Sequence, residues 1–340
     1  MSLPKIISLF SGAGGLDLGF QRAGYVIAFA SDVSQWAIET HKHNFPQTHS
    51  IVADLITLGP GGLLDELSTV LTDGESVAVI GGPPCQGFSR ANTSASSTDP
   101  RNQLPLLYLD CVKALQSRYD VKFVLFENVL GIRDTKHRVV FDKILFELRE
   151  LGFADQVDQY SALDYGVPQV RKRVIIVAFQ SRIALAKFSP TPVLVKDLTV
   201  ADAIKGFPEP TLFSHGLEKG SISFHPNHWT MQPRSSRFNK TKEPSAPSRS
   251  FRRLVWDKPS PTVAYGHREI HVHPEGHRRL SIYEAMVLQG FPEDFVLEGT
   301  LSAQVEQISN AVPPPLAFQL ARAATVALKV DEEKARYASE

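Results

Sequence analysis

Short apolar runs alternate with helical patterns over the first 180 residues, and this alternation constrains the fold of the chain most strongly. Strand-like runs are expected at 6–10, 26–31, 51–53, 77–80, 121–126 and 174–179. Between them, apolar residues recur at helical spacing at 16–23, 36–43, 104–117 and 141–151. Because strands separated by helices pair in parallel through crossover connections, the pattern predicts an α/β fold with a Rossmann-like, doubly wound, mostly parallel sheet.

The alternation ends after about residue 181. Eight prolines break the chain at 190, 192, 208, 210, 226, 233, 244 and 247, which is typical of a loop-rich region. Helical spacing returns at 281–289 and 315–330, so the chain is expected to come back to its first domain. We therefore expect a first domain over 1–184, a smaller loop-rich domain over 185–257, and a return segment over 258–340 whose C-terminal helix completes the first domain.

Composition excludes several other classes of protein. The 340 residues are 43% hydrophobic and 21% charged and contain two cysteines, as in a globular enzyme rather than a disordered, fibrous or disulfide-rich chain. No apolar run approaches the roughly 18 residues of a membrane span. The N-terminal residues do not resemble a signal peptide, and Cys-x-x-Cys is absent from the sequence. A cytoplasmic location without membrane contact is therefore expected.

The net charge of zero hides a local excess of positive charge. Residues 221–280 hold eleven lysines and arginines against four acids, a surplus of seven, and the rest of the chain carries the opposite surplus. A local positive potential attracts a polyanion while the remaining surface does not, so this segment is a candidate binding region for a nucleic acid. The alternative is a solvated basic loop without a partner.

The cysteine at position 85 lies in a loop of glycine and proline directly after the apolar run 77–80. Ligands of open α/β sheets bind beyond the carboxyl ends of such strands, so Cys85 is a candidate nucleophile. The other cysteine, Cys111, lies within a helical apolar pattern and is expected to be a core thiol.

Further polar residues are expected in the same crevice. Glu127 follows the run 121–126, where a partly buried carboxyl can act as an acid or as a hydrogen-bond anchor. Gln169, Arg171 and Arg173 precede the last run at alternate positions, which face one side of an extended chain. Two guanidinium groups directed at one site can bind a phosphate, a carbonyl oxygen or a carboxylate.

A glycine-rich turn joins the first predicted strand to the first helix. Gly12, Gly14 and Gly15 would allow a ligand to approach the backbone closely, and the start of the helix would present amide groups to it. Asp32 and Asp54 end the next two strands, where acids can bind the ribose of a nucleoside whose adenine stacks on Phe10 or Val33. The alternative is that both acids only cap the elements that follow them.

The motifs together resemble the cytosine-C5 DNA methyltransferases over nearly the whole chain. The matching motifs occur in order as Phe10-Ser11-Gly12-Ala13-Gly14-Gly15, Pro83-Pro84-Cys85-Gln86, Glu127-Asn128-Val129, Gln169-x-Arg171-x-Arg173, Arg279-Leu280-Ser281-x-x-Glu284-Ala285 through Leu288-Gln289-Gly290-Phe291-Pro292, and Asn310-Ala311-Val312-Pro313. Two positions depart from the family pattern. Ser309 stands where the family usually has glycine, and Asp32 stands where it more often has glutamate.

The resemblance implies a cofactor and a mechanism. The family binds S-adenosylmethionine, and the residues implied to surround it are Phe10, Gly12, Ala13, Gly14, Gly15, Leu16, Asp32, Val33, Asp54, Leu55, Pro84, Asn310 and Ala311. By the same resemblance Cys85 adds to C6 of cytosine, Glu127 contacts N3 and the exocyclic amine, and Arg173 or Arg171 contacts O2. The cytosine must leave the duplex to reach the thiol, so base flipping is implied.

The resemblance also implies partners. Double-stranded DNA would be read by the region 185–257, and the candidate contacts are Gln86, Ser89, Arg234, Arg237, Asn239, Lys240, Arg252 and Arg253. A bacterial restriction-modification role is implied, with a restriction endonuclease acting separately and a monomeric methyltransferase.

Two other functions stay open at this stage, and a metal is not expected. These alternatives are a tRNA-directed relative on the same fold and a binding protein that has lost turnover. Four histidines, at positions 267, 271, 273 and 277, suggest a metal site, but no cysteine joins them and arginines interleave.

Overall fold

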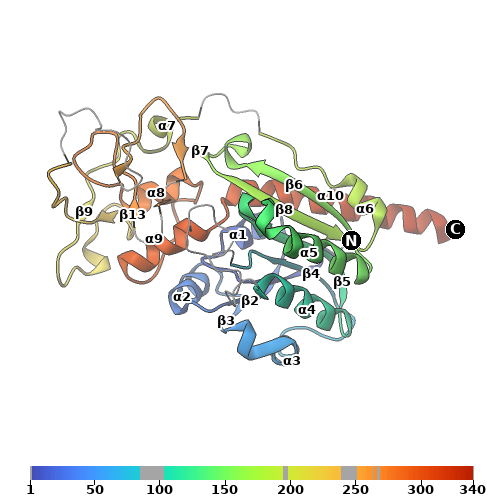
Figure 1. Cartoon of the computed structure of the whole chain (residues 1–340). Coiled ribbons are helices and arrows are strands. Elements are labelled where there is room, and N and C mark those ends of the chain that lie inside the picture. The colour runs from blue at the N-terminus through green and yellow to red at the C-terminus, as the bar shows by residue number, and fades with distance from the viewer. Residues whose placement is uncertain are drawn as a thin grey trace.

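The computed structural model describes residues 2–84, 103–193, 198–238, 251–262, 264–265 and 269–339. Its main sheet has seven strands in the order β3-β2-β1-β4-β5-β8-β6 (Figure 1). Their bounds are β1 Lys5–Leu9, β2 Ile27–Asp32, β3 His49–Val52, β4 Ser76–Gly81, β5 Asp120–Asn128, β6 Ala154–Ser161 and β8 Lys172–Phe179. The first five strands pair in parallel, whereas β8 runs antiparallel to both β5 and β6. The predicted mostly parallel sheet is confirmed.

Helices cover both faces of this sheet. One hydrophobic cluster joins a sheet face to α3 (Leu55–Leu67), α4 (Leu104–Gln116) and α5 (Arg138–Glu150). A second cluster joins the opposite face to α1 (Gly15–Arg22), α6 (Arg182–Lys187) and α10 (Pro314–Ser339). The strands are buried between the two layers, which explains why they appear in the sequence as continuous apolar runs. The fold is therefore doubly wound, as predicted.

The region between α6 and α10 contains mostly short elements, and it lies to one side of the sheet (left in Figure 1). Its helices are α7 (Val200–Ile204), α8 (Ile282–Leu288) and α9 (Leu301–Asn310). Its two-residue strands are β9 Thr211–Leu212, β10 Trp229–Thr230, β11 Ser260–Pro261, β12 Ala264–Tyr265 and β13 Glu269–Ile270, and β11 pairs with β7 (Gln169–Val170). A third cluster joins α7, α8 and α9 to three residues near the N-terminal half of the sheet, Ala13, Leu18 and Phe45. The boundaries at residues 184 and 257 stay a prediction.

Two elements differ from the sequence-based expectation because their signals are weak. Strand β6, with the sequence Ala-Asp-Gln-Val-Asp-Gln-Tyr-Ser, lies at the edge of the sheet and is only partly buried, so it lacks an apolar run. Helix α3 contains Gly59 and Pro60, and Gly59 has non-helical φ and ψ angles of 64° and 171°. These two residues interrupt the helical pattern, because glycine and proline disfavour a helix interior.

The remaining predicted elements match the structure with shifts at their ends. The largest consequence concerns β5, which extends to Asn128, so that Glu127 is the second-last residue of the strand rather than the residue after it.

In the described part of the chain, no helix combines the length and apolar character that a membrane span needs.

Candidate active site

The carboxyl ends of β1, β2, β4 and β5 lie at one edge of the sheet, and most of the predicted site residues lie there. The glycine turn after β1 has an unusual backbone. Phe10 has a φ angle of 56° and Gly14 a φ angle of 85°, and Gly14 is the N-cap of α1. A positive φ in a non-glycine residue costs of order 1–3 kcal/mol, and such strain is concentrated at functional sites.

Asp32 holds the turn in place. Its Oδ2 accepts the Gly12 N–H at 2.9 Å, and its Oδ1 accepts the Ser34 N–H at 2.9 Å. Burial raises the pKa of the Asp32 carboxyl, and these two donors act against the rise. Ser34, not Asp32, is the N-cap of α2 (Gln35–Asn44), so Asp32 does more than cap the next element.

Asp54 lies at the end of the neighbouring strand and has a capping role. It is the N-cap of α3, where its carboxylate accepts the Ile56 N–H at 2.9 Å. Its side chain is exposed, as is that of Val33, whereas Leu55 is buried. Asp54 thus caps α3, and its part in binding a nucleoside stays a prediction.

Residues from the end of α9 close the glycine turn from the far side. A Cβ atom on Gly15 would lie 2.4 Å from the Val312 carbonyl oxygen, so only glycine permits this approach. Ala311 is buried, whereas Asn310 is exposed. Gln289, for which the sequence alone predicts no separate role, fixes the segment by donating to the carbonyls of Ile308 and Ala311 at 2.8 Å each. The sequence signal that points to it is a glutamine directly after an apolar helical run, and the structure shows this side chain fully buried.

The nucleophile candidate Cys85 lies outside the described residues, as do Gln86 and Ser89. Pro84, the last described residue before it, is partly exposed, and Pro83 is buried. The Asn128 side chain donates to the Pro83 carbonyl at 3.4 Å. The described part of the proline loop is thus connected to the end of β5, where Glu127 lies.

Glu127 and Arg173 form an ion pair at the site. The Arg173 Nε lies 2.8 Å from the Glu127 Oε1, and the two side chains are 13% and 10% exposed. Such a pair fixes both groups while leaving each a small exposed area. Because β5 and β8 are antiparallel neighbours, the pair joins the carboxylate at the end of one strand to the guanidinium near the start of the other.

Arg171 is fully buried and lies on the side of the chain predicted for it. The burial alternates as expected, because Gln169 and Arg171 are buried while Val170 and Lys172 are exposed. The Arg171 Nη2 donates to the Ser309 carbonyl at 2.8 Å, and its Nε and Nη1 are buried without a hydrogen-bond partner. Burial lowers the pKa of Arg171 well below its usual value, and Arg173 acts in the same direction.

The bond to Ser309 explains one departure from the family pattern. The acceptor is a backbone carbonyl, which any residue at this position supplies. Serine can therefore replace the usual glycine without loss of the contact with Arg171.

The basic residues predicted to bind DNA are not equivalent. Arg234, Arg237 and Arg252 are exposed, whereas Arg253 is half-buried and its Nε donates to the Pro274 carbonyl. Asn239 and Lys240 lie outside the described residues. Cys111 is fully buried, and burial raises the pKa of its thiol to about 12, as expected of a core thiol.

Known proteins resemble this chain in sequence over most of its length. A family model described as C-5 cytosine-specific DNA methylase matches residues 4–325. The Type II methyltransferase M.MthTI of Methanothermobacter thermautotrophicus is 34% identical over 346 residues, covering 93% of this chain and 96% of that protein. The Type II methyltransferase M.NgoPII of Neisseria gonorrhoeae is 31% identical over 343 residues, covering 94% of each.

Solved structures resemble it in fold. A DNA modification methyltransferase encoded within an E. coli prophage has a TM-score of 0.74 and 25% identity, and the match covers 96% of this chain and 100% of that one. The S. pombe Dnmt2 methyltransferase shares the fold with a TM-score of 0.64 at 17% identity, covering 97% of this chain and 99% of that one.

Proposed function

The chain belongs to the C-5 cytosine-specific DNA methylase family, and from this premise we propose that it methylates a flipped-out cytosine in duplex DNA through a covalent bond to Cys85. The observation that carries the proposal is the buried Glu127–Arg173 pair at the end of β5, connected through Asn128 to the loop that continues into Cys85. A carboxyl and a guanidinium fixed side by side suit the N3, amine and O2 edge of one cytosine.

The residues around the glycine turn fit S-adenosylmethionine. A Cβ atom built on Gly12 meets nothing within 4 Å, so the turn has open space beside it. Each Asp32 oxygen accepts one backbone N–H and can still accept a ribose hydroxyl, and exposed Val33 and Asp54 border the same edge. When bound there, the cofactor would supply an electrophilic methyl group on a sulfonium.

The residues of the chain divide the chemistry among them. The Cys85 thiolate forms a bond to C6, the electron pair of the C5–C6 double bond moves to the C4–C5 bond, and the C4–N3 pair moves to N3, where the protonated form of Glu127 supplies a proton. The ring becomes electron-rich at C5, and C5 takes the methyl group, whose bond to sulfur would break so that the cofactor would leave as a neutral thioether. Loss of the C5 proton to a base then restores the double bond as the C6–Sγ bond breaks, which releases Cys85 as thiolate, and N3 returns its proton to Glu127.

Arg173 and Arg171 have different parts in this scheme. Arg173 lies against Glu127 and retains some exposed surface, so it is the arginine that binds O2 of the cytosine. Arg171 is fully buried on the Ser309 carbonyl and positions the start of β8 against the end of α9. Both arginines raise the local positive potential, which favours the thiolate form of Cys85.

Recognition of DNA falls to the region 185–257. Its exposed Arg234, Arg237 and Arg252 are available to phosphates or to base edges. The unpairing of the target cytosine costs a few kcal/mol, which contacts in the pocket offset.

Because the similar proteins are named Type II methyltransferases, we assign this chain a protective role beside a separate restriction endonuclease. We further propose that it acts on DNA as a monomer in the cytoplasm.

The mechanism is tested by the variant Cys85→Ala. It should lose methylation entirely while it binds DNA as the wild type does, measured by label transfer from S-adenosylmethionine and by a gel-shift titration. Cys111→Ala is the matched control, since it removes the other thiol, which lies buried in the core, and should retain turnover. Full turnover by Cys85→Ala would exclude the covalent route.

A further inference from the structure

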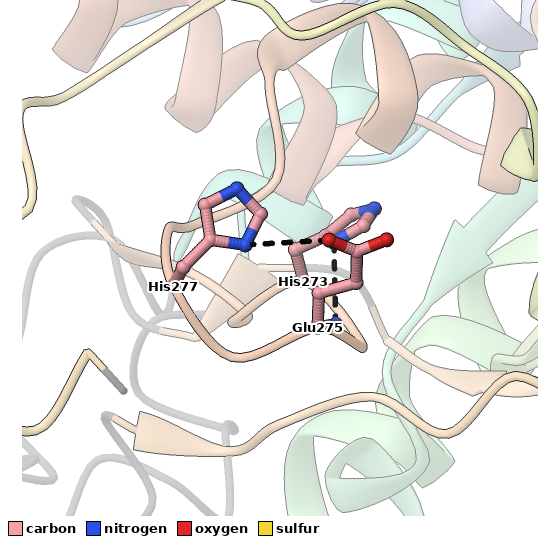
Figure 2. A group of neighbouring side chains, drawn as sticks. All are labelled: His273, Glu275 and His277. Carbon is pink, nitrogen blue, oxygen red and sulfur yellow. Dashed lines mark hydrogen bonds and ion pairs between the residues drawn. The ribbon is translucent and has the colours of Figure 1, made fainter. Parts of the chain in front are cut away.

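Three potential metal ligands lie on one tight turn before α8. The sequence His273-Pro274-Glu275-Gly276-His277 reverses direction there, with the His273 N–H donating to the Arg278 carbonyl at 2.9 Å and the Gly276 N–H to the His273 carbonyl at 2.8 Å. Gly276 has a φ angle of 80°, which favours glycine. Figure 2 shows that the turn brings His273, Glu275 and His277 to the same side.

The ligand atoms of these three residues lie within 4.8 Å of one another. His273 is buried, and its Nδ1 accepts the Glu275 N–H at 3.3 Å. The Nδ1 of His277 is buried and has no hydrogen-bond partner, and it lies 3.7 Å from the Glu275 Oε2. Both Nδ1 atoms thus face the Glu275 side of the turn, and one of them lacks the partner that a buried polar atom normally has.

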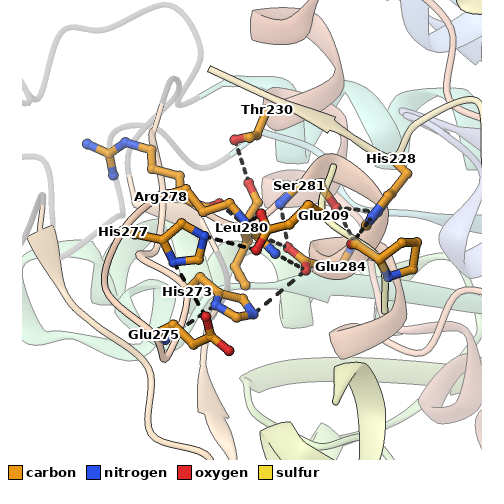
Figure 3. A network of polar contacts seen from close by, with 12 residues as sticks. Glu209, His228, Thr230, His273, Glu275, His277, Arg278, Leu280, Ser281 and Glu284 are labelled. Atoms are coloured by element: carbon orange, nitrogen blue, oxygen red, sulfur yellow. Dashed lines mark hydrogen bonds and ion pairs between the residues drawn. The ribbon is translucent and has the colours of Figure 1, made fainter. Parts of the chain in front are cut away.

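The other ring nitrogen of each histidine faces a carboxylate, as Figure 3 shows. The His277 Nε2 lies 3.0 Å from the Glu209 Oε1, and the His273 Nε2 lies 3.8 Å from the Glu284 Oε1. A carboxylate behind the imidazole is the usual outer partner of a metal-binding histidine. For His277 it holds the proton on Nε2 and leaves the Nδ1 lone pair free. The His273 Nδ1 would exchange its 3.3 Å bond from the Glu275 N–H for the metal.

The surrounding charges favour a cation. Arg278 pairs with both oxygens of Glu284 and with Glu209, and Arg253 donates to the Pro274 carbonyl. The three carboxylates of Glu209, Glu275 and Glu284 therefore exceed the two guanidinium groups in number.

We propose that His273, Glu275 and His277 bind one divalent transition-metal ion, for which Zn²⁺ is the best match, with water in the fourth position. Two imidazoles and one carboxylate are a common zinc ligand set. Bond lengths of about 2.0–2.2 Å place tetrahedral ligands about 3.3 Å apart, so the side chains need to close by roughly 1 Å or a little more. Glu275 is exposed and can make most of this movement.

The proposed site uses only two of the four histidines that the sequence suggested as metal ligands. The Nε2 of His271 bonds to the Thr262 carbonyl at 2.8 Å, and His267 lies outside the described residues. The third ligand is instead Glu275, which a search for cysteine and histidine does not detect. The bound ion would fix the turn to the network of Arg278 and Glu284 at the start of α8, independently of the methyl-transfer reaction.

The proposal is tested by titrating Zn²⁺ into chelator-treated, full-length protein by calorimetry, with the thermal midpoint measured in parallel. Wild type should bind one ion per chain and gain thermal stability. His277→Ala should weaken binding on the order of 100-fold, and Glu209→Gln, which removes only an outer partner, by about 10-fold. His215→Ala, at an exposed histidine of the same region, should bind as the wild type does.

Both test variants alter partly or largely exposed side chains, so they should fold; His277 is 22% exposed and Glu209 is 64% exposed. Equal affinity in wild type and His277→Ala would overturn the proposal, and so would the absence of saturable binding at one ion per chain. X-ray absorption of the zinc-loaded protein gives a second test, since it should show nitrogen and oxygen ligands that include two imidazoles.

Discussion

Arg171 and Arg173 are two residues apart and face the same side of the chain, yet their surroundings assign them different tasks. One nitrogen of Arg171 donates to the Ser309 carbonyl, and the side chain is fully buried. Arg173 shares its Nε with Glu127 and retains exposed surface. The structure thus distinguishes an arginine that is enclosed between two parts of the fold from one that keeps some exposed surface, and we propose that the second one contacts the substrate.

Glu127 is the residue whose chemistry can be tested most cleanly. Glu127→Gln keeps the shape of the side chain but removes its acid function, so kcat should fall by about 10²–10⁴-fold while the affinity for S-adenosylmethionine stays within about twofold. Single-turnover methylation and cofactor titration measure the two quantities. Glu150→Gln, at an exposed position on α5, is the matched control and should have wild-type kcat.

If Glu127→Gln instead lowered the affinity for S-adenosylmethionine by about 10²–10⁴-fold, Glu127 would support the cofactor site rather than the chemical step.

The sequence predicted Glu127, Arg171 and Arg173 as a group because strand ends and alternate positions leave recognisable signals. It did not predict the partner of Arg171, because a backbone carbonyl at position 309 leaves no trace in residue identity.

At the scale of elements, the contact between α1 and α10 brings the C-terminal helix onto the first helix of the chain. A Cβ atom on Gly19 would lie 2.3 Å from the Ala317 Cβ and 2.5 Å from the Ala317 carbonyl carbon. The helices therefore touch at a point where no side chain fits.

Gly19→Ala should lower the free energy of unfolding by about 1–3 kcal/mol, because the added methyl group forces the two helices apart. Urea denaturation measures the change. Gly61→Ala is the control on α3, where a Cβ meets nothing within 4 Å, and it should be neutral or stabilise by up to about 1 kcal/mol. If the two variants had equal stability, the close packing of α1 on α10 would be wrong.

The elements that the sequence predicted well are those buried on both faces. Strands β1, β4 and β5 have continuous apolar runs because helices cover them on either side. The edge strand β6 has no such constraint, and the Gly59-Pro60 pair hides α3. An element buried on both faces therefore leaves a clearer pattern in the sequence than an element at the edge of the fold.

At the scale of the whole molecule, the site forms only when distant parts of the chain meet. The glycine turn near residue 12 packs against Val312, and the start of β8 is tied to Ser309. The third core cluster continues from these contacts into the region between α6 and α10. Loss of packing in that region should therefore affect both cofactor binding and stability.

That region should also be sensitive to acid. Burial lowers the pKa of His225 from 6.5 to about 4, and its ring stacks on Tyr283 with centroids 3.9 Å apart. Between these two pH values the unfolded chain binds a proton that the folded chain does not, so stability is present above pH 6.5 and is lost as the pH falls toward 4.

His225→Asn removes this titration, and its amide oxygen can still accept the Asn227 N–H that the His225 Nδ1 accepts at 3.0 Å. The variant should be less stable than wild type at pH 7, but it should lose about 2 kcal/mol less of its unfolding free energy between pH 7 and pH 5. Urea denaturation at the two pH values measures this difference. Parallel pH profiles for the two proteins would contradict the assignment.

The central claim is that this chain methylates C5 of cytosine in DNA. It is tested most directly by incubating the purified protein with labelled S-adenosylmethionine and unmethylated duplex DNA, with tRNA in a parallel reaction, and mapping the modified base at single-nucleotide resolution. We predict label on cytosine C5 within one short recurring sequence of the DNA. Label on tRNA alone, or on neither nucleic acid, would contradict the claim.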